Sequence, residues 1–234
     1  MSPREQNLPA GGHNDRLAQF LAISPEGGRC VLYLPQFRGD VLLDAGLAQG
    51  FPLHYPGNTY SRRDARAAFY ITSLLSGVLD PENISVENAT ANSVLPGPGQ
   101  TAFLFGSRSN ILTQRVAETT ELRRLFRFEF GPWWNIVFGG EVFSIPDPSQ
   151  LGEDSYRLHT DYGVISRSFD PTTQAVSFIL AGLGARATEG SAYFLTRNWK
   201  EMFERFHGRD FAVLLKFPPP VDPRRFQLVA DAAI

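Results

Sequence analysis

The stretch that decides the fold is Thr101–Thr113, which reads TAFLFGSRSNILT. Its apolar run, Ala102–Phe105, stops at Gly106, and a helical pattern begins at Ile111. A strand that ends in a glycine and continues as a helix leaves backbone N–H groups pointing outward, where they can bind an anion. This stretch therefore predicts a strand-to-helix junction of an α/β fold and a place where a ligand could bind.

On both sides of this stretch, strand patterns alternate with helical ones. Helices placed between apolar strands are typical of a largely parallel sheet that is covered on both faces. The expected strands are 29–37, 84–88, 101–105, 126–130, 134–138, 141–145, 162–169, 175–180 and 211–217. The expected helices are 62–79, 110–125 and 188–206, and one or two helical turns could form at 16–23. We therefore expect one three-layer α/β domain with a mostly parallel central sheet.

The domain borders follow from changes in composition. The expected parts are a flexible arm at 1–28, one α/β domain at 29–217 and a proline-rich tail at 218–234. Within the domain, residues 126–160 are expected to be an insertion, because Gly139-Gly140 between two short apolar runs favours a tight hairpin turn. We expect the antiparallel strands of this insertion to join one edge of the sheet.

Composition and charge exclude several classes of protein. The chain has 234 residues, of which 43% are hydrophobic and 20% are charged, as in globular domains. Its net charge is −2, so nucleic acid is not an expected partner. No run reaches the ~18 apolar residues of a membrane span, and no signal segment opens the chain, so we expect no membrane contact and a cytoplasmic location.

The thiol and imidazole groups predict no metal centre. Cys30 is the single cysteine and lies in an apolar run, so we expect a buried packing residue. The four histidines are His13, His54, His159 and His207, and their spacing matches no zinc pattern. We therefore expect no metal, and the chain indicates no particular cofactor.

A second strand-to-helix junction follows the strand expected at 175–180. Residues 181–190 read AGLGARATEG, a G-x-G-x5-G pattern. Because a dinucleotide loop needs G-x-G-x-x-G, an ordinary NAD oxidoreductase is disfavoured. Gly182 and Gly184 still allow close approach of the backbone, and Thr188 could cap the helix that follows.

The two junctions could form one site. In an open parallel sheet, ligands bind beyond the carboxyl ends of the strands, so neighbouring junctions would face the same crevice. Arg108 and Arg186, one in each loop, could neutralise an anion there. The candidate ligand-binding residues are Gly106, Ser107, Arg108, Ser109, Asn110, Gly182, Gly184, Arg186 and Thr188. The alternative is purely structural. Glycine is needed in tight turns, helices are commonly capped by serine or asparagine, and exposed arginines are common.

Asp161 is the candidate catalytic residue. It lies in His159–Gly163, directly before a predicted strand, and could orient a hydroxyl group or act as a base. An aspartate at the start of a strand can equally be a turn residue. The chain lacks the G-x-S-x-G elbow and the P-loop pattern, and its only lysines are Lys200 and Lys216, so no hydrolase or nucleotidase of those kinds is indicated.

Three segments carry a resemblance to a known group of domains. The segments FLFGSRSNILT, DYGVISR and ILAGLGARATEGSAYFL resemble those of bacterial Rossmann-like, nucleotide-sensor-type domains of uncharacterised function. The residues after Thr188, Glu189-Gly190-Ser191-Ala192, depart a little from the spacing of that pattern. Over residues 60–217 the resemblance implies a Rossmann-like three-layer sandwich with a crevice at the two junctions, and it assigns no catalytic residue.

Three hypotheses for the function follow. The first is a sensor or regulatory domain that binds a nucleotide-like or other anionic small molecule at the two junctions, with Asp161 selecting a hydroxyl group. The second is an enzyme that acts on a nucleotide or an N-glycosidic bond, with Asp161 or Glu189 as the polar catalyst. The third is a non-catalytic assembly or scaffold subunit, a homo-oligomer or the partner of another protein, which Trp133-Trp134 and the proline-rich tail favour.

Overall fold

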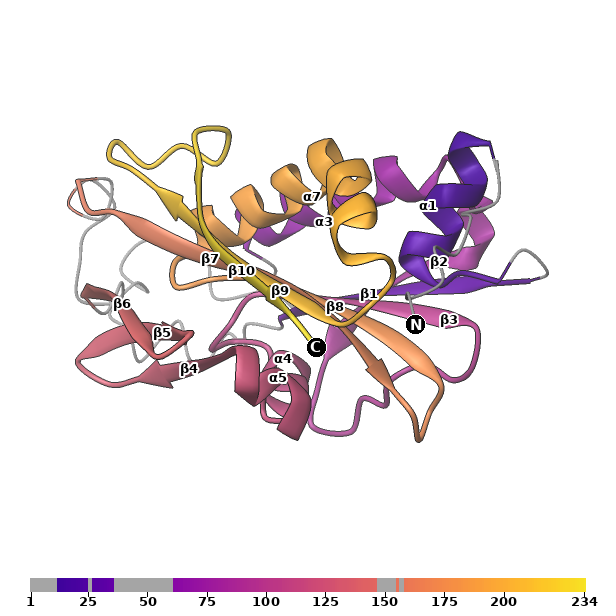
Figure 1. Cartoon of the computed structure of the whole chain (residues 1–234), viewed down its shortest axis with the longest axis horizontal. Coiled ribbons are helices and arrows are strands. Elements are labelled where there is room, and N and C mark those ends of the chain that lie inside the picture. The colour runs from indigo at the N-terminus through magenta and orange to yellow at the C-terminus, as the bar shows by residue number, and fades with distance from the viewer. Residues whose placement is uncertain (1–11, 25–26, 36–60, 147–154, 156–157) are drawn as a thin grey trace, which may run out of the picture.

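A seven-stranded mixed sheet forms the centre of the molecule (Figure 1). The computed structural model describes residues 12–24, 27–35, 61–146, 155 and 158–234. The strand order in this sheet is β10-β9-β7-β8-β3-β1-β2. Its strands are β1 (Arg29–Pro35), β2 (Ile84–Ala89), β3 (Gln100–Phe105), β7 (Asp161–Asp170), β8 (Ala175–Gly182), β9 (Phe211–Phe217) and β10 (Gln227–Ala233).

Most strands of this sheet run in one direction. β3 pairs in parallel with β1 and β8, and β1 pairs in parallel with β2. β7 is antiparallel to both β8 and β9, and β10 is antiparallel to β9. Strands β2, β1, β3, β8 and β9 therefore share one direction, which confirms the expected mixed α/β class and the mostly parallel sheet.

Helices and a second sheet cover the two faces of the central sheet (Figure 1). The helices are α1 (His13–Leu21), α3 (Arg62–Leu75), α4 (Ile111–Ala117), α5 (Thr120–Leu125) and α7 (Ala185–Phe206), with a 3-10 turn at Pro81–Asn83. Side chains of a strand alternate between its two faces. Phe103 and Phe105 accordingly join the core under α1, α3 and α7, whereas Ala102 and Leu104 join the core with α4 and α5.

Aromatic side chains fill the core under α1, α3 and α7. Phe103 stacks on Phe178 with 5.0 Å between ring centroids, and Phe206 stacks on Phe211 at 4.4 Å. Burying one phenylalanine contributes roughly 1.5–3 kcal/mol relative to leaving it exposed. Cys30 is fully buried in the same core, as expected, and burial raises the pKa of its thiol.

The insertion forms a sheet of its own and does not extend an edge of the central sheet, so that expectation was wrong. β4 (Phe126–Phe130), β5 (Trp133–Phe138) and β6 (Glu141–Pro146) form a three-stranded antiparallel sheet, and the expected turn at Gly139-Gly140 is confirmed. Its apolar side chains, among them Phe126, Ile136 and Ile145, share a core with α4 and the central sheet. The alternating apolar residues of these strands cover a face of the central sheet, which strands added at an edge could not do.

The segments expected as an arm and a tail contain regular elements. α1 lies within 1–28, where it overlaps the helical turns expected at 16–23, and buries Leu17, Phe20 and Leu21. β10 lies within 218–234 and pairs with β9 at the edge of the sheet. Residues 1–11 of the expected arm, residues 36–60, which include His54, and residues 147–154, 156 and 157 of the insertion lie outside the described residues. None of the described helices combines the length and the apolar character needed to cross a membrane.

Two helices differ in extent from the expectation. The pattern at 110–125 forms two helices, because Thr119 has the extended backbone of a new N-cap, with ψ at 148°. α3 ends at Leu75 instead of residue 79. Gly77, a residue type of low helical propensity, follows this end of the helix.

Candidate functional site

The two glycine junctions lie side by side. β3 and β8 are neighbours in the sheet, with Phe105 paired to Leu180. The Ser107 hydroxyl donates a hydrogen bond to the carbonyl oxygen of Gly182 at 2.7 Å. The expected convergence of the two junctions at one edge of the sheet is therefore confirmed.

Asn110 ties the first junction to the sheet. Its side chain is fully buried, and Nδ2 donates to the carbonyl oxygens of Tyr33 and Phe105, both at 3.0 Å. Its Oδ1 accepts from the backbone N–H groups of Leu112 at 3.0 Å and Thr113 at 3.1 Å. The amide thus joins the ends of β1 and β3 and caps α4, which uses its whole hydrogen-bonding capacity.

Arg108 of the same loop lies over an aromatic ring. Its guanidinium carbon is 5.2 Å from the ring centroid of Trp134 in β5, which is the geometry of a cation–π contact. Gly106 adopts φ +81°, a conformation that favours glycine. A ligand contact at Gly106, Ser107, Arg108, Ser109 or Asn110 stays a prediction.

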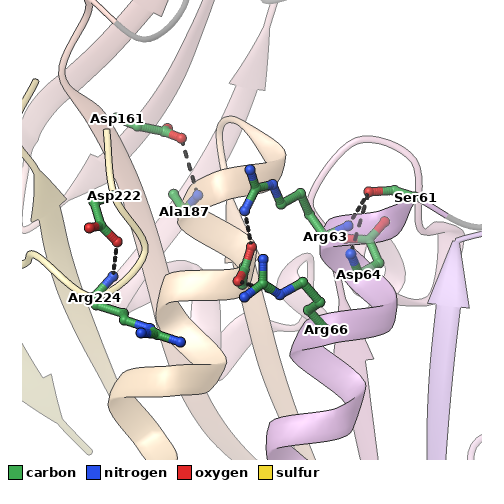
Figure 2. A network of polar contacts seen from close by, with 9 residues as sticks. Ser61, Arg63, Asp64, Arg66, Asp161, Ala187, Asp222 and Arg224 are labelled. Carbon is green, nitrogen blue, oxygen red and sulfur yellow. Dashed lines mark hydrogen bonds and ion pairs between the residues drawn. The ribbon is translucent and has the colours of Figure 1, made fainter. Parts of the chain in front are cut away.

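Asp161 occupies the N-terminus of α7. The residue is fully buried; Oδ1 accepts from the N–H groups of Tyr162 at 2.8 Å and Gly184 at 3.1 Å, and Oδ2 accepts from Ala187 at 3.2 Å. Figure 2 shows the carboxylate directed at the first turn of the helix. The protein's own anion therefore holds the position that a ligand would need at this helix end.

Close packing explains the glycine that ends β8. A Cβ on Gly182 would lie 2.5 Å from each of three atoms, namely the Cβ of Ala187, the carbonyl oxygen of Gly184 and the backbone nitrogen of Thr188. The Thr188 hydroxyl accepts from the N–H of Gly182 at 2.9 Å. Thr188 thus satisfies the backbone of the junction, while α7 itself begins three residues earlier, at Ala185, with Gly184 at its N-cap.

A cavity of about 430 Å³ opens beside this junction, at the N-terminal ends of α3 and α7. The residues that line it are Arg63, Arg66, Arg186, Glu189, Pro220, Val221, Asp222, Pro223 and Arg224. Of the residues expected from the sequence to contact a ligand, Arg186 lies in this lining, together with Glu189, the alternative catalyst. We call this the arginine cavity.

A buried carboxylate positions two of the arginines. Glu189 of α7 is 1% exposed, and its Oε2 lies 2.6 Å from Nη1 of Arg63, while its Oε1 lies 3.2 Å from Nε of Arg66. Both arginines reach from α3 toward α7 in Figure 2. A carboxylate this deeply buried needs such partners, because an uncompensated buried charge is costly. The ion pairs therefore hold both guanidinium groups at the cavity wall.

The opposite wall comes from the segment between β9 and β10. The backbone N–H of Arg224 donates to Oδ1 of Asp222 at 2.9 Å, which closes a tight turn. A hydrogen bond with Tyr70 of α3 raises the pKa of the Arg224 guanidinium. The cavity lining thus carries four arginines and two carboxylates, Glu189 and Asp222.

Asp64 lies behind the cavity wall, between Arg63 and Arg66 in the sequence. Ser61 caps α3 by accepting from the N–H groups of Arg63 at 3.1 Å and Asp64 at 3.4 Å. The Asp64 side chain is buried, and this burial raises its pKa to about 7, against a smaller opposing effect of the Ser61 hydrogen bond. Asp64 therefore changes charge near neutral pH, beside the arginine cavity.

Sequence reasoning missed most of this cavity. Arg63 and Arg66 stand three residues apart in the first turns of a predicted helix, a spacing that places them on one face. Residues 220–224 were expected to belong to a tail. The Arg63–Arg66 spacing was a usable signal, but no local pattern indicated that these residues would meet Glu189, which is 126 residues away from Arg63.

Comparison of the chain with family models, with curated proteins and with solved structures finds no match. Within the described part of the chain, no group of three or more histidine, cysteine, aspartate or glutamate residues is arranged to hold a metal ion. The chemistry of the site therefore has to be argued from its charges and geometry.

Proposed function

We propose that this chain is a Rossmann-like domain that binds a nucleotide-like or other anionic small molecule in the arginine cavity, as a sensor or regulatory domain. The observation that carries the proposal is the pair Arg63 and Arg66, held at the wall by the buried carboxylate of Glu189. Guanidinium groups that are fixed before a ligand arrives bind carboxylate or phosphate without first losing side-chain freedom.

The size and position of the arginine cavity support this proposal. Its volume of about 430 Å³ lies within the range of roughly 300–1,000 Å³ that is usual for small-molecule sites. It also lies beside the carboxyl end of β8, and ligands of open α/β sheets bind at such strand ends.

Binding without turnover is favoured by the state of the two expected catalysts. Asp161 is buried and accepts hydrogen bonds from three backbone N–H groups, and Glu189 is paired with two arginines. Each carboxylate is already engaged in structural contacts. To act as a general base, it would have to break them.

Isothermal titration calorimetry with the full chain, inorganic phosphate and a panel of nucleotides tests the proposal. Arg224→Gln and Arg66→Gln should each weaken binding by about tenfold or more, because each removes a charged hydrogen-bond donor. Arg123→Gln is the matched control, since Arg123 lies on α5, is exposed and pairs with Glu118. Arg108→Gln asks whether the first junction also contacts the ligand. Absence of binding, or equal binding by all variants, would reject the arginine cavity as the site.

A second candidate function is assembly with another protein. The outer face of the small sheet exposes Trp133 by 55% and Val142 by 58%. Both lie on one face, because Val142 pairs with Val137, four residues along β5 from Trp133. Exposed aromatic and aliphatic side chains on one face are typical of contact surfaces. A solution mass measurement of the full chain and of Trp133→Ser tests this: a multimer that Trp133→Ser dissociates supports assembly, and a monomer in both argues against self-association.

A further inference from the structure

We infer that two copies of this chain pair through β10, so that the central sheet continues from one copy into the other across a two-fold axis. β10 lies at one edge of the sheet, beside β9 (Figure 1). Among the strands that the structure describes, none pairs with the other side of β10. This edge is distinct from the arginine cavity and from the outer face of the small sheet, so the pairing does not depend on the proposed function.

The backbone of β10 presents hydrogen-bonding groups on its free side. In an antiparallel pair, residues that exchange hydrogen bonds alternate with residues that do not. The N–H of Ile234 donates to the carbonyl oxygen of Asp210 at 3.0 Å, and the register is regular from Ala230 to Ala233. Ala230 and Ala232 therefore direct their backbone groups toward β9, whereas Asp231 and Ala233 direct theirs outward.

One register pairs these outward groups with each other. If the two-fold axis passes through Ala232, Asp231 of each copy lies opposite Ala233 of the other, and each such pair exchanges both of its N–H···O bonds. The two copies of Ala232 then face each other as a pair without hydrogen bonds, with Cα atoms about 4.5 Å apart. Alanine side chains are small enough for this distance. An axis through Asp231 would instead set two like charges against each other, which is unfavourable.

The side chains of β10 favour a second copy as the partner. Residues 227–234 read QLVADAAI and contain no lysine, arginine or proline, the residues that commonly protect an edge strand. The one charged residue of this stretch, Asp231, is 13% exposed at its side chain, and its Oδ2 lies 2.6 Å from Nη2 of Arg205. A second copy thus brings a strand whose charge is already compensated. It also covers Ile234, which is 45% exposed and would lie opposite Ala230.

The opposite edge of the sheet does not offer the same surface. β2 carries Glu87 at an exposed position, and a charge of this kind disfavours pairing with another strand. Pairing at β10 is therefore a contact of one surface with itself, which closes after two copies and does not continue into a fibre.

Sedimentation equilibrium of the full chain over a range of concentrations tests the inference. Ala232→Lys and Ala232→Glu each place two like charges opposite each other at the axis, so each should weaken the dimer about fivefold or more. An equimolar mixture of the two variants should restore dimerisation, because lysine then faces glutamate. Ala233→Pro removes an outward N–H that β9 does not use, and it should also weaken the dimer. Val86→Lys, on the exposed part of β2, is the matched control and should dimerise like the parent chain.

Circular dichroism of each variant shows that the fold is retained. A parent chain that stays monomeric at every concentration would overturn the inference. A dimer that Ala232→Lys and Ala233→Pro leave unchanged would overturn it as well, and so would two folded variants at residue 232 that do not restore dimerisation when mixed. A dimer that Trp133→Ser dissociates, while Ala232→Lys does not, would place the contact on the small sheet.

Discussion

Replacing Asp64 by asparagine should remove a pH-dependent loss of stability. Asp64 is 4% exposed, and its pKa is raised from 3.8 to about 7, chiefly because burial disfavours its charged form. The folded chain therefore keeps a proton that the unfolded chain releases between about pH 4 and pH 7. The stabilisation from the neutral carboxyl is complete below about pH 4 and is lost as the pH rises through 7.

The size of the effect follows from the pKa difference. A rise from 3.8 to about 7 is a little over three units, and each unit corresponds to about 1.36 kcal/mol, so the ionised group costs at most about 4 kcal/mol above pH 8. The amide introduced by Asp64→Asn has nearly the same shape as the carboxyl group and carries no charge. The variant should match the parent chain near pH 4 and exceed its free energy of unfolding by up to about 4 kcal/mol at pH 8.

Urea unfolding followed by circular dichroism at several pH values measures this difference. Asp170→Asn is a control of opposite sign, because hydrogen bonds, first of all with the backbone of Thr172, lower the pKa of Asp170. The Asp170 carboxylate stabilises the fold above about pH 4, and this stabilisation is lost as the pH falls. Asp170→Asn should therefore have a lower free energy of unfolding than the parent chain at neutral pH, and the difference should shrink in acid. If Asp64→Asn changed the free energy of unfolding equally at pH 5 and pH 8, the burial argument for Asp64 would be refuted.

Three further predictions concern the junctions and the ion pairs. Asn110→Asp keeps the cap on α4 but leaves two buried carbonyl oxygens without donors. The free energy of unfolding in urea should fall by roughly 2–4 kcal/mol. A stability equal to that of the parent chain would contradict the role of the Asn110 side chain in joining the strand ends. Gly182→Ala places a Cβ 2.5 Å from three atoms, so it should lose roughly 1–3 kcal/mol by thermal unfolding, and an unchanged Tm would mean that α7 can shift freely. Glu189→Gln leaves Arg63 and Arg66 without their counter-charge and should cost roughly 3 kcal/mol, less in high salt, whereas a salt-independent change would point to packing alone.

Local patterns were sufficient to predict the class of fold. The apolar run at Ala102–Phe105 has both of its faces buried, and a strand of that kind has to lie inside a covered sheet. The adjacency of the two glycine junctions followed from the rule that the carboxyl ends of parallel strands meet at one edge. The structure bears this out through the contact between Ser107 and Gly182.

The elements that were missed depend on contacts between distant parts of the chain. None of the residues of β10 is buried, although five of its seven residues are apolar, so its position depends on the edge of β9, which supplies its hydrogen-bond partners. The small sheet shows the same effect, since its alternating apolar pattern is compatible with an edge strand and with a covering layer. Only the position of the apolar core, which includes Phe126 and Leu214, decides between the two.

The candidate site shows why the glycine junctions indicated this edge of the sheet but did not indicate most of the arginines that line the cavity there. At the second junction, Gly182 is required because Ala187 and Thr188 pack against it. The carboxylate of Asp161 compensates the positive end of the α7 dipole. An anion that binds beside the N-terminus of α7 must therefore be held by side chains. The arginines that could do so come from segments around residues 63, 186 and 224, which no local pattern connects. A buried glutamate such as Glu189 is the most direct sign of them, because its charge can be tolerated only where cations converge.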